Sequence, residues 1–315
     1  MLSINDLLVA RDFSSVSDRA VRYAFDLAAR TGAILHVLHA EVLHEAGDGD
    51  DRSLSDDLEG LREELKETGA LAPEAVNTVR LKEATRRDVS PGPAIMNYAA
   101  EADVDLIALG TRGRRGASRI LLGSVAEEVV RQADRPVLTV RGAEDEEPVH
   151  APESIDRILV PVDFSEHARE AMQTAKEWAA LYDARIDALH VVPEKLNPAF
   201  YVGGVKSIYD MHPDIEEKVQ KRLNAFLTET GGPAVDVHSR VQVGNAAPDI
   251  VEFVGENEVD LVMMSTHGRT GLDRFLLGSV SEKVIRHVRC PVVTMKAFGR
   301  SLLASPASAS SKAEG

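Results

Sequence analysis

The chain has 315 residues, enough for two domains of ordinary size, and its 44% hydrophobic content is typical of a soluble globular protein. Its formal net charge of −15 opposes non-specific binding to nucleic acid or anionic lipid, and it is compatible with either a salt-rich cytoplasm or a basic partner. The single cysteine, Cys290, excludes an internal disulfide framework. Because no apolar run approaches the length of a membrane span and the start lacks a signal-peptide pattern, we expect a cytoplasmic protein without membrane insertion.

The predicted elements begin with a buried strand at Leu7–Ala10, a short apolar run. A helix with apolar residues on one face follows, and Ser14 or Ser15 can cap its start. Ala33–Leu38 predicts the second strand. Leu54–Leu65 carries its apolar residues on one helical stripe and predicts the second helix.

The rest of the first half continues the alternation. Val76–Lys82 is the third strand candidate, and Pro93–Ala102 is a helix with proline in its first turn. Leu106–Leu109 predicts a strand, Ser124–Gln132 a helix and Val137–Val140 a fifth strand. Strands that alternate with helices imply a parallel sheet covered by helices on both faces, with ligands at the carboxyl ends of the strands.

Repeated blocks indicate a duplicated domain. Residues 117–141 and 272–296 are identical at 12 of 25 positions without a gap. Two shorter blocks recur in the same order: LLVARDFS at 7–14 with ILVPVDFS at 158–165, and LHVLH at 35–39 with LHVVP at 189–193. We therefore predict two domains at 1–141 and 155–297, an acidic linker at 142–154 and a disordered tail at 298–315.

A glycine pattern follows the fourth strand of each half. The first half has Gly-x2-Gly-x9-Gly-Ser from Gly110 to Ser124, and the second keeps it from Gly268 to Ser279 with Ser265 in place of the first glycine. Glycines after a strand let backbone N–H groups approach a ligand, and the start of the next helix favours phosphate. A strand–helix connection without ligand is the alternative. The pattern is neither Gly-Lys-Ser/Thr nor GxGxxG, so P-loop and dinucleotide templates lack their motifs.

This glycine pattern, preceded by an apolar strand and followed by a helix and Pro-Val-x-x-Val, resembles the signature of ATP-binding universal stress proteins. The second half ends with Pro-Val-Val-Thr-Met, a mild variation, and its VPVDFS and LHV segments are also typical of the family. The resemblance covers essentially 1–141 and 155–297. It implies an adenine nucleotide alpha-hydrolase-like fold: in each domain, a five-stranded parallel sheet of order 3-2-1-4-5 with helices on both faces.

The resemblance also implies how each half would hold a nucleotide. An Asp at the end of the first strand would bind the ribose or a metal on the phosphates, its neighbours would line the base pocket, and glycines with a serine would cradle the phosphates. The implied residues of the first half are Ala10, Arg11, Asp12, Val37, Leu109, Gly110, Arg112, Gly113, Gly123, Ser124 and Val125. Those of the second half are Pro161, Val162, Asp163, Val191, Met264, Ser265, His267, Gly268, Gly278, Ser279 and Val280.

Each half departs from the family pattern once. Arg11 stands where the family has a small or apolar residue, so it could clash with the nucleotide or add charge to it. Ser265 replaces a glycine, which is tolerable if the backbone φ stays negative. We therefore expect both sites to bind, with unequal affinity.

Two residue types, Asp and His, have structural alternatives. Asp12 and Asp163 could only cap the following helix, and His36 and His190 lie within strands, where a buried structural role is the stronger interpretation. The ten histidines show no HExxH or clustered Cys/His spacing, so we expect no zinc site and no resident metal.

The predicted function is an ATP-binding stress-response or regulatory protein, with AMP or ADP as other ligands and Mg²⁺ accompanying the nucleotide. Slow ATP hydrolysis or autophosphorylation is compatible with the sequence, and no catalytic residue is assigned. An adenylate-forming enzyme of related fold and a nucleotide-free scaffold are the alternatives. The resemblance implies that Val137–Val140 and Val292–Met295 pair as edge strands about a pseudo-two-fold axis, and we expect a homodimer.

Overall fold

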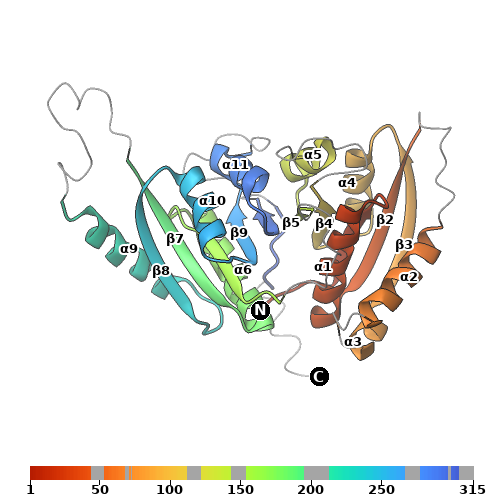
Figure 1. The fold of residues 1–315 in the computed structure, drawn as a ribbon, viewed down its shortest axis with the longest axis horizontal. Helices are drawn as coiled ribbons and strands as arrows, with labels where there is room; N and C mark the ends of the chain where they lie inside the picture. The colour runs from red at the N-terminus through yellow and green to blue at the C-terminus, as the bar shows by residue number, and fades with distance from the viewer. Residues whose placement is uncertain are drawn as a thin grey trace. The chain divides into compact units, whose positions relative to one another are not determined.

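The computed structural model describes residues 1–43, 53–67, 71, 73–111, 122–142, 154–194, 213–266, 277–296 and 299–304. The chain separates into two compact units (Figure 1). The first unit contains Met1–Ser154 together with Pro291–Gly315, and the second contains Ile155–Cys290.

The first unit is built on a sheet of six strands. In spatial order they are β3 (Arg80–Asp88), β2 (Ile34–Val42), β1 (Asp6–Arg11), β4 (Leu106–Gly110), β5 (Val137–Val140) and β10 (Val292–Met295). Strands β1 to β5 are parallel, and β10 pairs with β5 in the antiparallel direction. The predicted order 3-2-1-4-5 is confirmed in this half.

Helices cover both faces of this sheet, as predicted (Figure 1). One face carries α1 (Ser15–Thr31), α2 (Leu54–Glu67) and α3 (Pro73–Thr78). The other carries α4 (Pro91–Glu101) and α5 (Ser124–Gln132). The strands between these layers are apolar in the middle of the sheet, where Leu7, Leu8 and Val9 of β1 are completely buried.

Local signals fix the bounds of α1. The Ser14 side chain accepts a hydrogen bond from the Ser17 N–H at 3.2 Å, so Ser14 is the N-cap. The helix ends at Gly32, whose φ of 74° is the left-handed conformation that favours glycine at a C-cap. Between these caps, Val21 and Ala24 are among the buried apolar residues that face the sheet.

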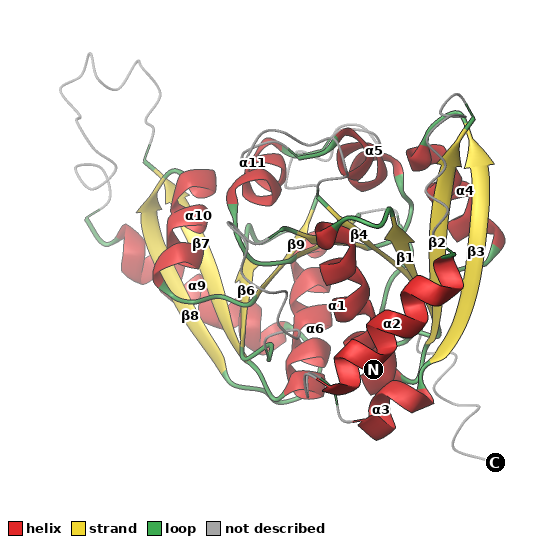
Figure 2. Ribbon diagram, turned by 45° about the vertical axis from the view of Figure 1, so that its right-hand side comes forward, coloured by secondary structure: helices red, strands yellow, loops and turns green. Residues whose placement is uncertain are grey.

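The second unit repeats the architecture with four parallel strands. In spatial order they are β8 (Val237–Gly244), β7 (Arg185–Pro193), β6 (Arg157–Pro161) and β9 (Leu261–Ser265). One face carries α6 (Glu166–Tyr182) and α9 (Ile215–Glu229), and the other carries α10 (Ala246–Glu256) and α11 (Ser279–His287), as Figure 2 shows. The predicted α/β fold class, with the same strand order repeated in each half of the chain, is confirmed.

The last strand of the second repeat belongs to the first unit. Val292, Val293 and Thr294 of β10 lie opposite Thr139, Leu138 and Val137 of β5. The predicted pairing of Val137–Val140 with Val292–Met295 is therefore confirmed. The pseudo-two-fold arrangement and the homodimer stay predictions.

The chain after β10 returns to the amino terminus of the first unit. The Ser3 N–H donates to the Leu302 carbonyl at 2.7 Å, the Ala304 N–H donates to the Met1 carbonyl at 2.9 Å, and Leu302 is only 1% exposed. Residues 299–304, which we predicted as the start of a disordered tail, are thus a packed part of the first unit. The prediction missed them because a single buried leucine in a small polar segment has no periodicity.

Arg300 ties the same segment to the amino ends of the strands. Its Nη2 lies 2.7 Å from Asp105 Oδ1, and its Nη1 lies 2.5 Å from Asp103 Oδ1. The other oxygen of Asp105 accepts the backbone N–H groups of Asn5 and Asp6 at 2.6 and 3.1 Å. Asp105 thereby links β1, the start of β4 and the carboxyl-terminal segment.

Lys296 gives this attachment a pH dependence. Its ammonium donates to the Arg131 carbonyl in the last turn of α5 at 2.5 Å, and burial lowers the pKa of Lys296 to about 8. Between that pKa and the ordinary lysine value the unfolded chain binds more protons, so stability should rise with pH. Because the side chain is only half-buried, we expect a gain of about 1–2 kcal/mol between pH 7.5 and pH 10.

Urea unfolding of wild type and Lys296→Met at the two pH values measures this effect. Other lysines and tyrosines titrate in both proteins, so their contributions cancel in the comparison. We expect the pH-dependent gain to be larger in wild type. Equal pH dependence of the two proteins would contradict the prediction.

The predicted third strand was wrong in its first part. Val76 lies in α3, and the strand runs from Arg80 to Asp88. Strand β3 is an edge strand in which most residues are exposed and charged, so it lacks the apolar run that marks an interior strand. The buried Val76 belongs to the helix before it and gave a misleading signal.

Among the helices in the described part of the chain, none is both long and apolar enough to cross a lipid bilayer.

Candidate functional site

The sheets place a switch in strand order at β1 and at β6. Strand β1 lies between β2 and β4, and β6 lies between β7 and β9. In parallel α/β sheets, ligands bind outside the carboxyl ends of the strands at such a switch. The carboxyl ends of β1 and β4, and of β6 and β9, therefore define one candidate site in each unit.

The Asp at the end of each first strand holds the serine that caps the following helix. Asp12 Oδ1 accepts the Ser14 N–H at 3.1 Å and the Ser14 hydroxyl at 2.6 Å. Asp163 Oδ1 does the same for Ser165, at 3.0 and 2.6 Å. The N-cap is the serine in both units, so each Asp orients the capping residue, and both of its contacts use the same carboxylate oxygen. A role of these carboxylates in nucleotide binding stays a prediction.

The turn between each Asp and Ser is in an uncommon conformation. Phe13 has φ 61° and Phe164 has φ 65°, the left-handed region that bulky residues rarely adopt. Such conformations cost of order 1–3 kcal/mol and cluster at functional sites. The same strained turn in both units marks this strand end as a shared structural requirement.

The Arg11 side chain is buried among carboxylates and a hydroxyl of α1 and α2. It is 4% exposed, and its guanidinium forms a two-point contact with Asp57 of α2 at 2.9 and 3.0 Å. The same group lies 2.5 Å from Asp18 Oδ1 and 2.5 Å from Ser17 Oγ. Its donors are therefore engaged by α1 and α2, and a contact of Arg11 with a nucleotide stays a prediction.

The carboxylate beside Arg11 has an altered pKa. Burial raises the pKa of Asp18, Arg11 lowers it, and Asp57 raises it further. The desolvation effect is the largest, so the pKa lies above the ordinary aspartate value even with the guanidinium in contact.

In the second unit, aromatic contacts hold α9, the helix that corresponds to α2, against the end of the first strand. Val162 replaces Arg11, and the Phe164 ring packs edge-to-face on Phe226 of α9 with centroids 5.9 Å apart. The guanidinium of Arg222 lies 4.2 Å from the Phe164 ring centroid, and that of Arg169 lies 4.6 Å from the Phe226 centroid. The surroundings of the two sites are therefore chemically different.

A glycine begins the helix after each fourth strand. The Gly123 N–H donates to the Thr111 carbonyl at 2.6 Å, and the Gly278 N–H donates to the Thr266 carbonyl at 2.9 Å. These contacts bring the start of α5 to the end of β4, and the start of α11 to the end of β9. Neither helix has a side-chain cap. Because each helix starts beside the end of a strand, the positive end of its dipole lies there.

Gly278 is required by close packing. A Cβ at this position would lie 2.8 Å from the Thr266 carbonyl oxygen, closer than real contacts allow. The serines that follow the two glycines, Ser124 and Ser279, are exposed, and Val125 and Val280 are half-buried. The helix starts therefore present both a hydroxyl and open backbone donors.

Ser265 fits its position. The backbone φ of Ser265 is not positive, and the φ of its counterpart Gly110 is not positive either. The glycine in the first unit answers a steric need, because a Cβ there would lie 2.9 Å from a Val16 methyl group. The second unit has His167 in place of Val16, and the backbone at Ser265 does not require a glycine because its φ is not positive.

The strand register revises one predicted correspondence. Ala10 lies opposite Leu38, and its counterpart Pro161 lies opposite Leu189. Leu38 therefore corresponds to Leu189, which is an offset of 151 residues, whereas the LHVLH and LHVVP blocks match at 154.

Val37 consequently lies away from the candidate site. It pairs with Val9 inside the sheet and is completely buried. The residue that corresponds to Val191 is Ala40, near the carboxyl end of β2. The sequence match misled because the His-Val pair recurs by chance three residues earlier, and only strand pairing reveals the shift.

Of the other predicted residues, one group lies at the candidate sites and a second group lies outside the described residues. Gathered at the carboxyl ends of the strands, or at the helix starts that follow them, are Ala10, Asp12, Leu109, Gly110, Gly123 and Ser124 in the first unit. In the second unit these are Pro161, Val162, Asp163, Val191, Met264, Ser265, Gly278 and Ser279. Arg112, Gly113, His267 and Gly268 lie outside the described residues.

His36 has the buried structural role that we expected. It is 1% exposed, with Nε2 2.8 Å from Asp6 Oδ1 and Nδ1 2.9 Å from the Tyr98 hydroxyl. The second unit places a reversed pair there, with Asp187 Oδ2 2.5 Å from Arg157 Nε. Both pairs tie the first two strands together inside the sheet.

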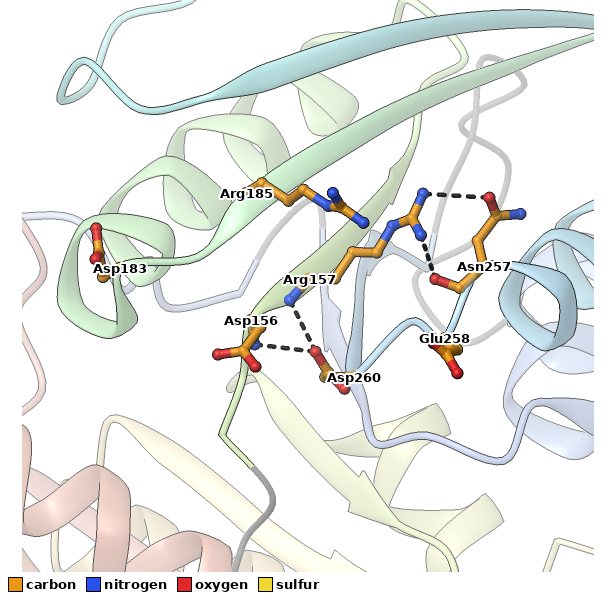
Figure 3. Close-up of a pocket in the computed structure, with 7 residues that line it drawn as sticks. All are labelled: Asp156, Arg157, Asp183, Arg185, Asn257, Glu258 and Asp260. Atoms are coloured by element: carbon orange, nitrogen blue, oxygen red, sulfur yellow. Dashed lines mark hydrogen bonds between the residues drawn. The ribbon is translucent and has the colours of Figure 1, made fainter.

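A polar pocket lies at the opposite, amino ends of the strands in the second unit (Figure 3). It is lined by Asp156, Arg157, Asp183, Arg185, Asn257, Glu258 and Asp260. Asp260 accepts the backbone N–H groups of Asp156 and Arg157 at 2.9 and 2.8 Å, as Asp105 does in the first unit. Arg157 contacts Asn257, so these groups stabilise the sheet edge. Within the described ranges, no group of three His, Cys, Asp or Glu could hold a metal ion.

The two units define a class: a tandem α/β protein with a switch-point site at the carboxyl ends of each parallel sheet. The chain belongs to the universal stress protein family, because the model of that family matches residues 4–141 and 154–296.

Individual relatives agree with this assignment. A universal stress protein of Methanocaldococcus jannaschii is 35% identical over 143 residues, which are 44% of this chain and 81% of the relative. One from Mycolicibacterium smegmatis is 27% identical over 307 residues, covering 92% of this chain and 96% of the relative. The crystal structure of a putative universal stress protein from Pseudomonas aeruginosa is similar in fold, with a TM-score of 0.64, 20% identity and 93% of both chains covered.

Proposed function

We propose that the chain is a stress-response or regulatory protein that binds an adenine nucleotide at the carboxyl ends of both sheets. The observation that carries the proposal is the pair of uncapped helix starts at Gly123 and Gly278, each hydrogen-bonded to the end of the fourth strand beside the strand-order switch. Open backbone donors on a positive helix end suit phosphate groups. Membership of the universal stress protein family supports the same ligand class.

The residues that would hold the nucleotide follow from the site. The helix starts and Ser124 or Ser279 would bind the phosphates, and Asp12 or Asp163 would face the ribose. ATP is the proposed ligand, with AMP or ADP as related ones, and Mg²⁺ would accompany the phosphates. We propose no fast turnover, since the described site residues include no arranged general base.

Mass spectrometry of the purified full chain tests the proposal directly. We expect co-purified adenine nucleotide, binding of ATP by calorimetry and hydrolysis only over hours. A chain that neither carries nor binds any adenine nucleotide would contradict the proposal. Fast release of pyrophosphate with a second substrate would instead identify an adenylate-forming enzyme.

Substitution of Gly278 should weaken ATP binding at the second site. In Gly278→Ala the new Cβ meets the Thr266 carbonyl oxygen at 2.8 Å, so the start of α11 must shift. We expect ATP affinity at this site to fall about tenfold or more, because the backbone donors move away from the phosphates.

Gly255→Ala is the matched control. Gly255 lies in α10 of the same unit, and a Cβ there meets nothing within 4 Å. Calorimetric titration of ATP should show normal binding for this control. Unchanged second-site affinity in Gly278→Ala would exclude the helix start from the site.

A further inference from the structure

Two histidines occupy the same place in the two units. His39 Nδ1 lies 2.8 Å from the backbone carbonyl oxygen of Arg11, and His190 Nδ1 lies 2.6 Å from that of Val162. A carbonyl oxygen only accepts hydrogen bonds, so Nδ1 carries the hydrogen in both rings. This fixes the histidine tautomer at the carboxyl end of the second strand in each sheet.

Each imidazole also packs against the strained turn. The ring centroids of His39 and Phe13 are 4.7 Å apart, and those of His190 and Phe164 are 4.4 Å apart. The two phenylalanines are the residues with φ near +60° described above. In each unit, one imidazole thus contacts both a backbone carbonyl at the end of the first strand and the turn that follows it.

The neighbours of these histidines differ between the units. In the first unit the carbonyl belongs to Arg11, which is ion-paired to Asp57, and in the second it belongs to Val162. A role in general core packing would allow the histidine to change along with its neighbours. The bond from histidine to carbonyl and the contact from histidine to phenylalanine are nevertheless present in both, which indicates a need shared by the two strand ends.

We propose that His39 and His190 are positioning residues for the two nucleotide sites. Each holds the backbone carbonyl just before Asp12 or Asp163 and the phenylalanine turn just after it, and thereby orients the backbone that carries this Asp. This inference rests on the proposed nucleotide function. It assigns a role to a residue that contacts the site backbone, not the ligand.

The tautomer can be measured in the wild-type full chain. Long-range ¹H–¹⁵N NMR spectra of histidine side chains at neutral pH should show hydrogen on Nδ1 for His39 and His190, assigned by the loss of each signal on substitution. His36 provides an internal reference, because Asp6 accepts from its Nε2 and requires the other tautomer. Hydrogen on Nε2 alone in His39 and His190 would overturn the proposal.

Paired variants test the effect on binding. Asparagine can place an amide N–H near the position of Nδ1, whereas leucine keeps bulk and removes the donor. We expect His39→Leu/His190→Leu to weaken ATP binding about tenfold or more, and His39→Asn/His190→Asn to stay within about threefold of wild type. Normal ATP binding by the folded leucine variant would overturn the inference.

The outcomes separate the inference from the function on which it rests. A wild-type chain that binds no ATP contradicts the proposed function, whatever the histidine tautomer. A wild-type chain that binds ATP equally well with leucine at both positions contradicts only the positioning role. If the leucine variant does not fold, the wild-type tautomer and the recovery of binding by asparagine decide.

Discussion

A chain that ends at residue 298 should lose about 4–6 kcal/mol of the unfolding free energy of its first unit. This stop removes the segment that contains Arg300 and the buried Leu302. Burial of one leucine contributes about 2–3 kcal/mol, and each of the backbone hydrogen bonds to Met1 and Ser3 contributes about 1 kcal/mol. Removal of Arg300 also leaves the nearly buried Asp105 carboxylate without its cation.

Two independent signals can report the two units. The only tryptophan, Trp178, lies in the second unit, so its fluorescence follows that unit during urea unfolding. Hydrogen exchange of the β1 and β4 amides follows the first unit. We expect the truncation to speed exchange in β1 and β4 more than it shifts the tryptophan transition.

A stop after Ala304 is the control for this truncation. It removes only residues beyond the packed segment and should leave both signals at wild-type values. If the two truncated chains are equally stable, residues 299–304 do not stabilise the first unit. If both lose stability alike, the stabilising contacts lie beyond Ala304.

The sequence predicted elements best where local chemistry sets their limits. The bounds of α5 and β5 match the prediction, because Gly123 precedes a helical stripe and Pro136 precedes a short apolar run. Ser14, one of the two serines predicted to cap the start of α1, is the N-cap. Duplication gave the fold class, since blocks repeated in the same order require the same architecture.

The sequence failed where distant contacts decide. Leu302 is buried only because the chain returns to the amino terminus, and no local pattern encodes that return. Val37 was chosen in place of Ala40 because pairing register depends on the neighbouring strand. His39 was missed for the same reason: its role is visible only once its ring is seen beside Phe13.

Arg11 also shows this limit. Its position beside the candidate site suggested a contact with ligand, and the sequence did not reveal its two carboxylate partners, Asp18 in α1 and Asp57, which lies far along the chain in α2. The predicted inequality of the two sites stays a prediction. We now expect this inequality to arise from the different contacts at the two strand ends, which are ion pairs of Arg11 in the first unit and aromatic contacts of Phe164 in the second.

Arg11→Val, which copies Val162 of the second unit, should destabilise the first unit by about 3–4 kcal/mol at neutral pH. The substitution leaves the carboxylates of Asp18 and Asp57 near each other without the buried guanidinium between them. Breaking one partner of a buried ion pair is costly, because the remaining charges have lost solvent and gained no compensation. Hydrogen exchange in β1 again gives a readout specific to this unit.

Acid should reduce the cost of Arg11→Val. Burial already raises the pKa of Asp18 in wild type, and removal of Arg11 takes away the main effect that lowers it. A carboxyl group with a raised folded-state pKa contributes stability below its unfolded-state pKa and loses it as pH rises through the folded-state value. The difference in unfolding free energy between wild type and Arg11→Val should therefore become smaller from pH 7 toward pH 4.

The triple variant Arg11→Val/Asp18→Asn/Asp57→Asn is the matched control, because it removes the carboxylate charges together with the cation. We expect it to recover most of the lost stability and to show no such decrease in the difference from wild type at low pH, since neither asparagine titrates. A triple variant as unstable as Arg11→Val would show that the packing of the arginine stem, and not its charge, holds α2 against the strand end.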